Sequence, residues 1–383
     1  MTLGRVCSIV LYALIAALTC ILAYQIQPLQ AGDAGWVNGQ RTRRSYQNRL
    51  FMAGIFLILF AMAALRFDIG NDYRQYTQTA HEAYVGGYVV TEIGFNMLVK
   101  LLYQIAGGEY YELVFAVFAF FTLLFFLKAF ARQSVSFYQT FFLFMTWGLY
   151  FQTFNTVRYY LALSIALFSM KYVQERDNIK FVFWIVIAAL FHKSVLLVIP
   201  VYCLATFAWK KWHIIVGIVV SAMCFLGKGL VLKLALVLYP SYRNTIYLEG
   251  GSSPIGILRT VAVLTLYFWF LWFSGDGIRE KDWYPKLRFY GQLNFLAFIT
   301  GTVFSFLPVV TRITYYFSVS QLFMIPLIVE QIENEKVKKR VKMVVFVACI
   351  LYFGMFLLQA HQDGVGLLPY RSWLFEHERY HYK

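Results

Sequence analysis

Four ionisable residues that are far apart in the sequence fall at or near the ends of strongly apolar segments. They are Asp72, Arg158, His192 and Arg312. Ionisable groups inside or against a bilayer are costly, so they usually mark a functional site. Arginine presents a planar fork that matches phosphate oxygens, while aspartate and histidine can act as general bases. We therefore expect one charged cavity that opens on the non-cytoplasmic side of a membrane.

Two weaker candidates accompany these residues. Arg259 lies about one turn into a later apolar segment, and Glu92 precedes an amphipathic stretch. Two or three cations in one pocket predict a doubly charged ligand such as a diphosphate. Simpler interpretations exist, since an arginine at the end of a span can extend to the headgroups and a histidine in an apolar run can be a helix-packing residue. Asp72 can equally be a solvated loop residue that pairs with Arg66 or Arg74.

The composition is typical of a chain that lies mostly in a membrane. Of 383 residues, 60% are hydrophobic and only 14% are charged, whereas soluble domains carry roughly 25% charged residues. The net charge of +15 would suggest nucleic acid as a partner of a soluble protein, but in membrane proteins Lys and Arg accumulate in cytoplasmic loops. The five cysteines lie in apolar segments and predict neither a disulfide framework nor a zinc site. We expect no metal, no cofactor and no nucleic-acid partner.

About twelve apolar segments have the length or nearly the length of a membrane span. The sequence therefore predicts an all-α polytopic integral membrane protein with a single domain over residues 1–383. The N-terminus is expected outside, because the basic residues then gather in the inner loops. Residues 179–209 are too long for one crossing, so we expect a break at His192. The predicted spans are 7–25, 50–66, 110–128, 137–153, 156–173, 179–192, 195–209, 211–226, 256–274, 288–306, 311–331 and 343–360.

Three further segments are expected on the outer side, where they would enclose the cavity. Residues 67–91 are predicted to form a polar loop and residues 92–106 an amphipathic helix in the interface. Residues 227–255 are predicted to form a loop that covers a substrate groove. This last loop contains Tyr239, Tyr242, Arg243 and Tyr247. Tyrosine rings can stack on sugar rings, but they also form the interfacial belt of membrane proteins.

The order of these residues resembles the EpsG family, a branch of the Wzy-type polysaccharide polymerases. The resemblance covers roughly residues 50–330. Two positions depart from the family pattern, since Ile93 interrupts the usual Glu-Pro-Gly-Phe form and Val195 stands where alanine is common. The motifs are Gly70-Asn71-Asp72-Tyr73 with Tyr76, Glu92-Ile93-Gly94-Phe95, Arg158-Tyr159-Tyr160-Leu161-Ala162, Phe191-His192-Lys193-Ser194, and Arg312 with Tyr315 and Tyr316.

The resemblance implies a glycosyltransferase of the C type that polymerises O-antigen or exopolysaccharide repeat units. Donor and acceptor would be undecaprenyl-diphosphate-linked oligosaccharides at the outer face of a bacterial inner membrane. Arg158 and Arg312 would hold the donor diphosphate with help from Arg259. His192 would either orient that phosphate or take the acceptor proton, and Asp72 is the other candidate base.

Further residues of the motifs are expected to contact the substrate. They are Tyr73, Tyr76, Glu92 and Tyr315. A separate protein is the expected regulator of chain length. Three alternatives remain open: a flippase or transporter for lipid-linked sugar, a membrane O-acyltransferase that acts on glycans, and a scaffold subunit. A flippase should need cations within reach of both leaflets, and the inner halves of the predicted spans carry almost no charge.

Overall fold

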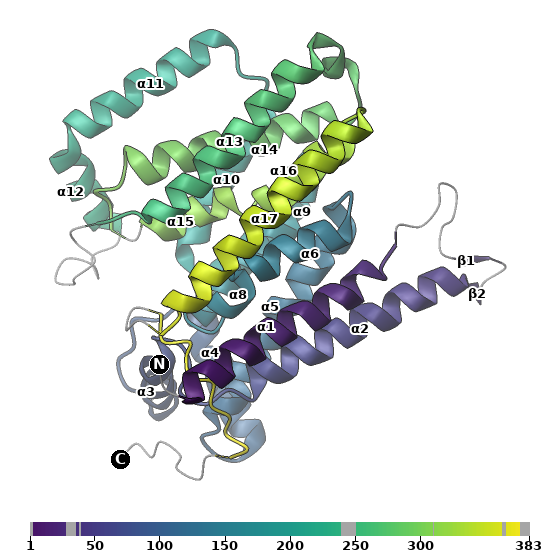
Figure 1. Ribbon diagram of the computed structural model, residues 1–383. Coiled ribbons are helices and arrows are strands. Elements are labelled where there is room, and N and C mark those ends of the chain that lie inside the picture. Colours follow the sequence, from purple (N-terminus) through teal and green to yellow (C-terminus); the bar gives the residue numbers. More distant parts are fainter. Residues whose placement is uncertain are drawn as a thin grey trace. The chain divides into compact units, whose positions relative to one another are not determined.

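The computed structural model of the protein describes residues 3–27, 36–37, 40–238, 250–308, 310–361 and 365–375. This part of the chain is almost entirely helical (Figure 1). A short antiparallel hairpin is formed by β1 (Trp36–Val37) and β2 (Gln40–Arg41). The chain divides into two compact units, and the boundaries between them fall within three helices and after residue 332. Each unit is described separately below.

The first unit comprises Met1–Phe168, Ile187–Lys193 and Glu333–Lys383. Within it, α1 lies along α2 and α6, and α2 lies along α5 (Figure 1). Its helices are α1 (Leu3–Tyr24), α2 (Arg43–Ala64), α3 (Tyr73–Val85), α4 (Ile93–Ala106), α5 (Tyr111–Gln133), α6 (Phe137–Thr146), α7 (Leu149–Gln152), most of α8 (Val157–Gln174), the end of α9 (Asn178–Ala189) and α17 (Glu335–Gln359).

The second unit comprises Ser169–Val186 and Ser194–Ile332. Here α14 is central, because it packs against α10, α13, α15 and α16. The described helices are the end of α8, most of α9, η1 (Lys193–Leu197) after its first residue, α10 (Val198–Thr206), α11 (Lys211–Leu226), α12 (Lys228–Leu238), α13 (Pro254–Ser274), η4 (Asp276–Glu280), α14 (Tyr284–Thr302), α15 (Val310–Ser318) and α16 (Gln321–Gln331). No residue of α11 is buried, and α12 is bent by 86° from it at Gly227.

Every predicted span lies mostly in helix, but among the described helices fewer than predicted are long and apolar enough to cross a membrane. In the described part of the chain, six helical segments are long and apolar enough to cross a membrane: α1, α2, α5, α13, α15 with α16, and α17. The bent pair α11 and α12 would be a seventh. Others are short, since α9 has 12 residues and so extends about 18 Å, against a hydrocarbon core of about 30 Å. The count of twelve therefore stays a prediction.

The predicted loop at 67–91 is wrong in its middle, where α3 forms. Tyr73, Tyr76, Thr77, Ala80 and Ala83 are buried on one face of this helix. Most of the remaining positions are polar, so the short segment has little overall hydrophobicity and its sequence resembles a loop. The predicted helix at 92–106 is confirmed as α4, while its location in a membrane interface stays a prediction.

The predicted loop at 227–255 is wrong at its start, which forms α12. This helix continues the apolar pattern of α11 after a bend at Gly227. The sequence predicted a loop here because Gly227 is followed by Lys228 and Gly229, and this combination is typical of the start of a loop. Four residues named in this loop lie outside the described residues. They are Tyr239, Tyr242, Arg243 and Tyr247.

Candidate functional site

Glu92 forms the centre of a charged cluster in the first unit. Its Oε2 atom accepts a short hydrogen bond from Arg158 Nη1, and its Oε1 atom accepts the backbone N–H of Lys193 at 3.1 Å. His192 Nδ1 lies 3.6 Å from the same Oε1 atom. The side chains of Arg158, Glu92 and His192 are only 19%, 13% and 10% exposed. The cluster is therefore largely shielded from water, which strengthens its electrostatic interactions.

Gly94 allows the start of α4 to reach this cluster. Its N–H donates to Leu190 O at 2.9 Å, and a Cβ atom at this position would lie 2.6 Å from the same oxygen. Only glycine permits such a close approach between two backbones. The contact places Glu92, two residues earlier, beside His192, two residues after Leu190. This close contact explains why a glycine stands in the motif Glu92-Ile93-Gly94-Phe95.

Arg158 lies in the first turn of α8 against two aromatic rings. Its guanidinium carbon is 5.5 Å from the ring centroids of both Tyr76 and Phe95, which is within the range of cation–π attraction. No acidic residue lies near Arg158 in the sequence. The structure supplies Glu92, which is 66 residues away in the chain.

His192 lies just after α9, where its N–H donates to Ala188 O at 3.0 Å. Its ring makes an edge contact with Tyr159, with centroids 5.4 Å apart. The imidazole is therefore positioned between an aromatic ring and the Glu92 carboxylate. The predicted break at His192 is confirmed, because α9 ends at Ala189 and η1 begins at Lys193.

Asp72 is held against the segment that precedes Arg158. Its Oδ2 atom accepts a hydrogen bond from Thr156 Oγ1 at 3.2 Å, and Asn71 N–H donates to Asn155 Oδ1 at 2.8 Å. Arg74 pairs with Asp68 instead of Asp72, with 2.7 Å between Nη2 and Oδ2. These hydrogen bonds fix the segment 67–72, here called the Asp72 loop, relative to the start of α8.

Gly70 brings this loop close to the backbone before α8. It has a φ of +100°, and a Cβ atom there would lie 2.4 Å from Phe154 O. Both the left-handed conformation and the close contact require glycine. Tyr73 and Tyr76, which follow in the same motif, are buried. The Tyr73 ring stacks on Phe115 and the Tyr76 ring lies against Arg158, and contact with a sugar stays a prediction for both.

Arg66 is a buried cation that the sequence analysis considered only as a partner for Asp72. The residue is only 2% exposed. Its guanidinium carbon lies 4.8 Å from the ring centroid of Phe115 and 5.1 Å from that of Phe154. Its Nη1 atom donates to Ala63 O at 2.5 Å. Because Phe154 precedes Asn155 and Thr156, Arg66 supports the segment that holds the Asp72 loop.

Residues 365–375, here called the C-terminal clasp, bind the end of α2 and the loop after it. Tyr370 Oη donates to Met62 O at 3.0 Å, and Trp373 Nε1 donates to Ala64 O at 3.2 Å. Burial raises the pKa of Tyr370 to about 12, so it remains a donor at physiological pH. Backbone bonds add to these contacts: Trp373 N to Leu65 O, Phe67 N to Arg371 O, and Gly70 N to Gly366 O, at 3.1, 2.9 and 2.9 Å.

The clasp therefore satisfies carbonyl groups that the end of a helix leaves without intrahelical partners. No motif in the sequence predicts a role for this segment. Its contacts join residues about 300 positions apart, and no local pattern marks them. Tyr370 and Trp373, which follow an apolar helix, are a possible sign of such contacts. Aromatic residues that lie in a membrane interface give the same pattern in a sequence.

In the second unit, Arg259 and Arg312 lie near the starts of α13 and α15. The Arg259 guanidinium is 5.6 Å from the ring centroid of Tyr315. The next residue, Tyr316, places its hydroxyl 3.2 Å from Ser194 Oγ and accepts a hydrogen bond at its carbonyl from Tyr202 Oη at 2.6 Å. The predicted convergence of Arg312 with Arg158 and His192 involves residues of both units and stays a prediction.

Comparison with known proteins gives one match. The sequence model of the EpsG family matches residues 49–372. This range includes the Glu92 cluster, the Asp72 loop, Arg66 and most of the C-terminal clasp. No curated protein and no solved structure gives a match.

Proposed function

The chain belongs to the EpsG family of Wzy-type polysaccharide polymerase-like membrane proteins, and on that premise we propose that it joins polyprenyl-diphosphate-linked oligosaccharide repeat units. The reaction would take place at the outer face of a bacterial inner membrane. A hydroxyl of one lipid-linked unit attacks the anomeric carbon of the growing glycan. The new C–O bond forms as the bond to the carrier diphosphate breaks, and the diphosphate leaves with the electron pair.

The Glu92–Arg158–His192 cluster carries this proposal. The departing diphosphate gains negative charge, which a preorganised guanidinium in a shielded site stabilises. A guanidinium has five N–H donors in a fixed fork, so one arginine can hold a carboxylate and a phosphate together. In this proposal Glu92 fixes the orientation of Arg158, and Arg158 binds the diphosphate of the donor.

The proton of the acceptor hydroxyl needs a base within the same site. We favour His192, because its Nδ1 atom faces the Glu92 carboxylate at 3.6 Å. A carboxylate beside an imidazole orients the ring and stabilises the cation formed when it takes a proton. Asp72 is the alternative base, and its bond to Thr156 places it beside the start of α8.

Arg259 and Arg312 are proposed as further phosphate-binding residues, and Tyr315 as a residue that contacts sugar. Guanidinium groups can supply the positive charge that a divalent cation supplies at other phosphate sites. We therefore propose that turnover needs no added metal. Undecaprenyl-diphosphate-linked oligosaccharide would be the substrate, and a separate chain-length regulator a partner.

The test uses purified protein in nanodiscs with an undecaprenyl-diphosphate-linked repeat unit and a metal chelator. Wild type should give a ladder of lipid-linked glycans on a gel, and Arg158→Ala should give none. Arg74→Ala is the matched control, because Arg74 is 71% exposed and pairs with Asp68 outside the cluster. A normal ladder from Arg158→Ala would overturn the assignment. Binding without a ladder, across a panel of repeat units, would favour the flippase or scaffold.

A further inference from the structure

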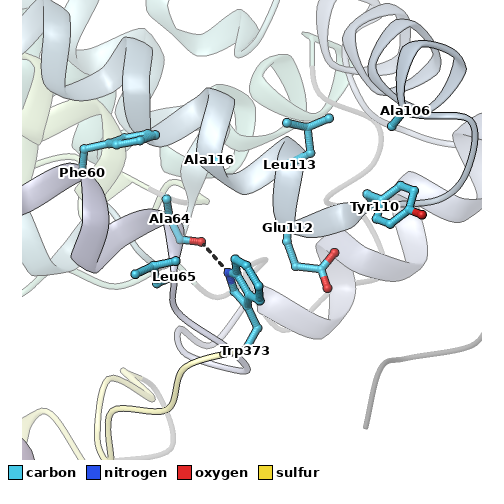
Figure 2. A pocket seen from close by; sticks show the side chains of 9 residues that line it. All are labelled: Phe60, Ala64, Leu65, Ala106, Tyr110, Glu112, Leu113, Ala116 and Trp373. Atoms are coloured by element: carbon cyan, nitrogen blue, oxygen red, sulfur yellow. Dashed lines mark hydrogen bonds between the residues drawn. The ribbon is translucent and has the colours of Figure 1, made fainter. Parts of the chain in front are cut away.

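An apolar pocket in the first unit lies apart from the charged cluster. Its volume is about 470 Å³, within the range of about 300–1,000 Å³ that is typical of small-molecule sites. Figure 2 shows the ends of three elements around it. Phe60, Ala64 and Leu65 of the α2 end lie on one side, and Ala106 and Tyr110 lie on the other.

Small side chains on three different helices create this space. Ala64, Ala106 and Ala116 come from α2, α4 and α5, and each leaves room that a larger residue would fill. Because α2 and α5 are both long and apolar enough to span a membrane, the pocket lies at the ends of two candidate spans. Hydrocarbon chains and headgroups meet at that depth.

One acidic side chain lines this otherwise apolar pocket. Glu112 lies in the first turn of α5, and its carboxylate is drawn at the pocket in Figure 2. A carboxylate attracts an ammonium group and repels an anionic headgroup. Trp373 of the C-terminal clasp completes the wall, and tryptophan is enriched where one side of a ring meets lipid and the other meets polar groups.

We propose that this pocket binds a membrane lipid with an ammonium headgroup. An acyl chain would occupy the space beside the three alanines, and the ammonium would pair with Glu112. This inference does not depend on the proposed polymerase activity. It assigns the pocket a lipid that stays bound and supports the clasp through Trp373.

The test measures lipids retained by the full-length protein. Protein in detergent is given equal amounts of phosphatidylethanolamine and phosphatidylglycerol, and bound lipids are counted by native mass spectrometry. Wild type should prefer phosphatidylethanolamine by roughly fivefold, the upper end for a partly exposed ion pair. Ala116→Trp should fill the pocket and lose the retained lipid. Glu112→Gln should keep a lipid but lose the preference.

Leu57→Trp is the matched control, because Leu57 is an exposed apolar position of α2 outside the pocket. It should retain lipid as wild type does. Equal retention of the two lipids by wild type would overturn the proposal, as would an Ala116→Trp protein that retains as much as the control. Glu112→Gln removes only a charge, so it keeps the test decisive if Ala116→Trp does not fold.

Discussion

At the scale of residues, the central feature is a carboxylate that contacts three groups at once. Glu92 meets Arg158, His192 and the Lys193 backbone, so it fixes their positions relative to one another. Removing one partner of a shielded charge pair leaves the other uncompensated, which is more costly than never having made the pair. Glu92 is therefore expected to be as sensitive to substitution as Arg158.

Glu92→Gln should lower polymer formation by about 100-fold or more, because the neutral amide no longer holds the Arg158 guanidinium in a single orientation. Initial rates of ladder growth measure the effect, and a thermal melt checks that the protein is folded. Glu109→Gln is the control, since Glu109 contacts His81 and not the cluster. Wild-type rates from Glu92→Gln would exclude a role for this carboxylate.

Gly94→Ala should destabilise the protein by about 1–3 kcal/mol, the usual cost of overpacking. The added methyl would meet the Leu190 backbone at 2.6 Å, and a backbone cannot move aside as a side chain can. Gly354→Ala is the comparison, because nothing lies within 4 Å of that position in α17. Thermal melts in detergent should rank the first variant well below the second; similar melting temperatures would contradict the close contact.

The sequence identified the candidate residues of the first unit but not their pairing. Asp72, Arg158 and His192 stood out because charges beside apolar segments are rare, and Glu92 followed from its motif. Which carboxylate meets which cation depends on how α4, α8 and α9 approach one another, and residues 66 positions apart carry no local signal of contact. Arg66 was misjudged for the same reason, since burial is a property of the packed structure.

At the scale of elements, the C-terminal clasp completes the capping of α2, where Leu65 N–H and Arg66 Nη1 already donate to Ala61 O and Ala63 O. Helix ends usually find local partners for their last carbonyls. Here two side-chain donors, Tyr370 and Trp373, come from the far end of the chain. The apolar segments could be identified from the sequence because hydrophobicity and segment length are local properties. The helix α3 is mostly polar and the clasp is short, and both are held by contacts with residues far away in the sequence.

Tyr370→Phe should lower stability by about 1 kcal/mol, because it removes the hydroxyl that donates to Met62 O and leaves that carbonyl without this partner. Tyr88→Phe serves as the reference, since Tyr88 is exposed. Chemical or thermal unfolding in the same detergent compares the two. If both variants unfold like wild type, the hydroxyl bond does not contribute to the end of α2.

At the scale of the whole molecule, the orientation in the membrane decides whether the cluster can meet substrates outside the cell. The distribution of Lys and Arg predicts that the loop before α4 lies outside and the turn after α5 lies inside. The 23 residues of α5 are enough to cross the bilayer between them. The cluster at the start of α4 would then face the exterior.

A cysteine introduced either at Tyr88 or at Val135 tests this orientation, because both positions are exposed and they lie on opposite sides of α5 in the sequence. An impermeant maleimide added to intact spheroplasts should label Tyr88→Cys and should label Val135→Cys only after lysis. Wild type treated with the same maleimide gives the background from the five native cysteines. The reverse pattern would place the cluster in the cytoplasm and rule out polymerisation at the outer face.

The clasp also determines when the end of α2 can be completed during synthesis of the chain. Trp373 is 309 residues beyond Ala64, its hydrogen-bond partner, so the end of α2 leaves the ribosome long before the residues that bind it. At about 5–20 residues per second, the delay is roughly 15–60 s. Gly70, beside Asp72, likewise receives its contact with Gly366 only after the clasp has been made. A nascent chain already inserted in the membrane would therefore hold the end of α2 and the Asp72 loop without these contacts until the clasp has been made.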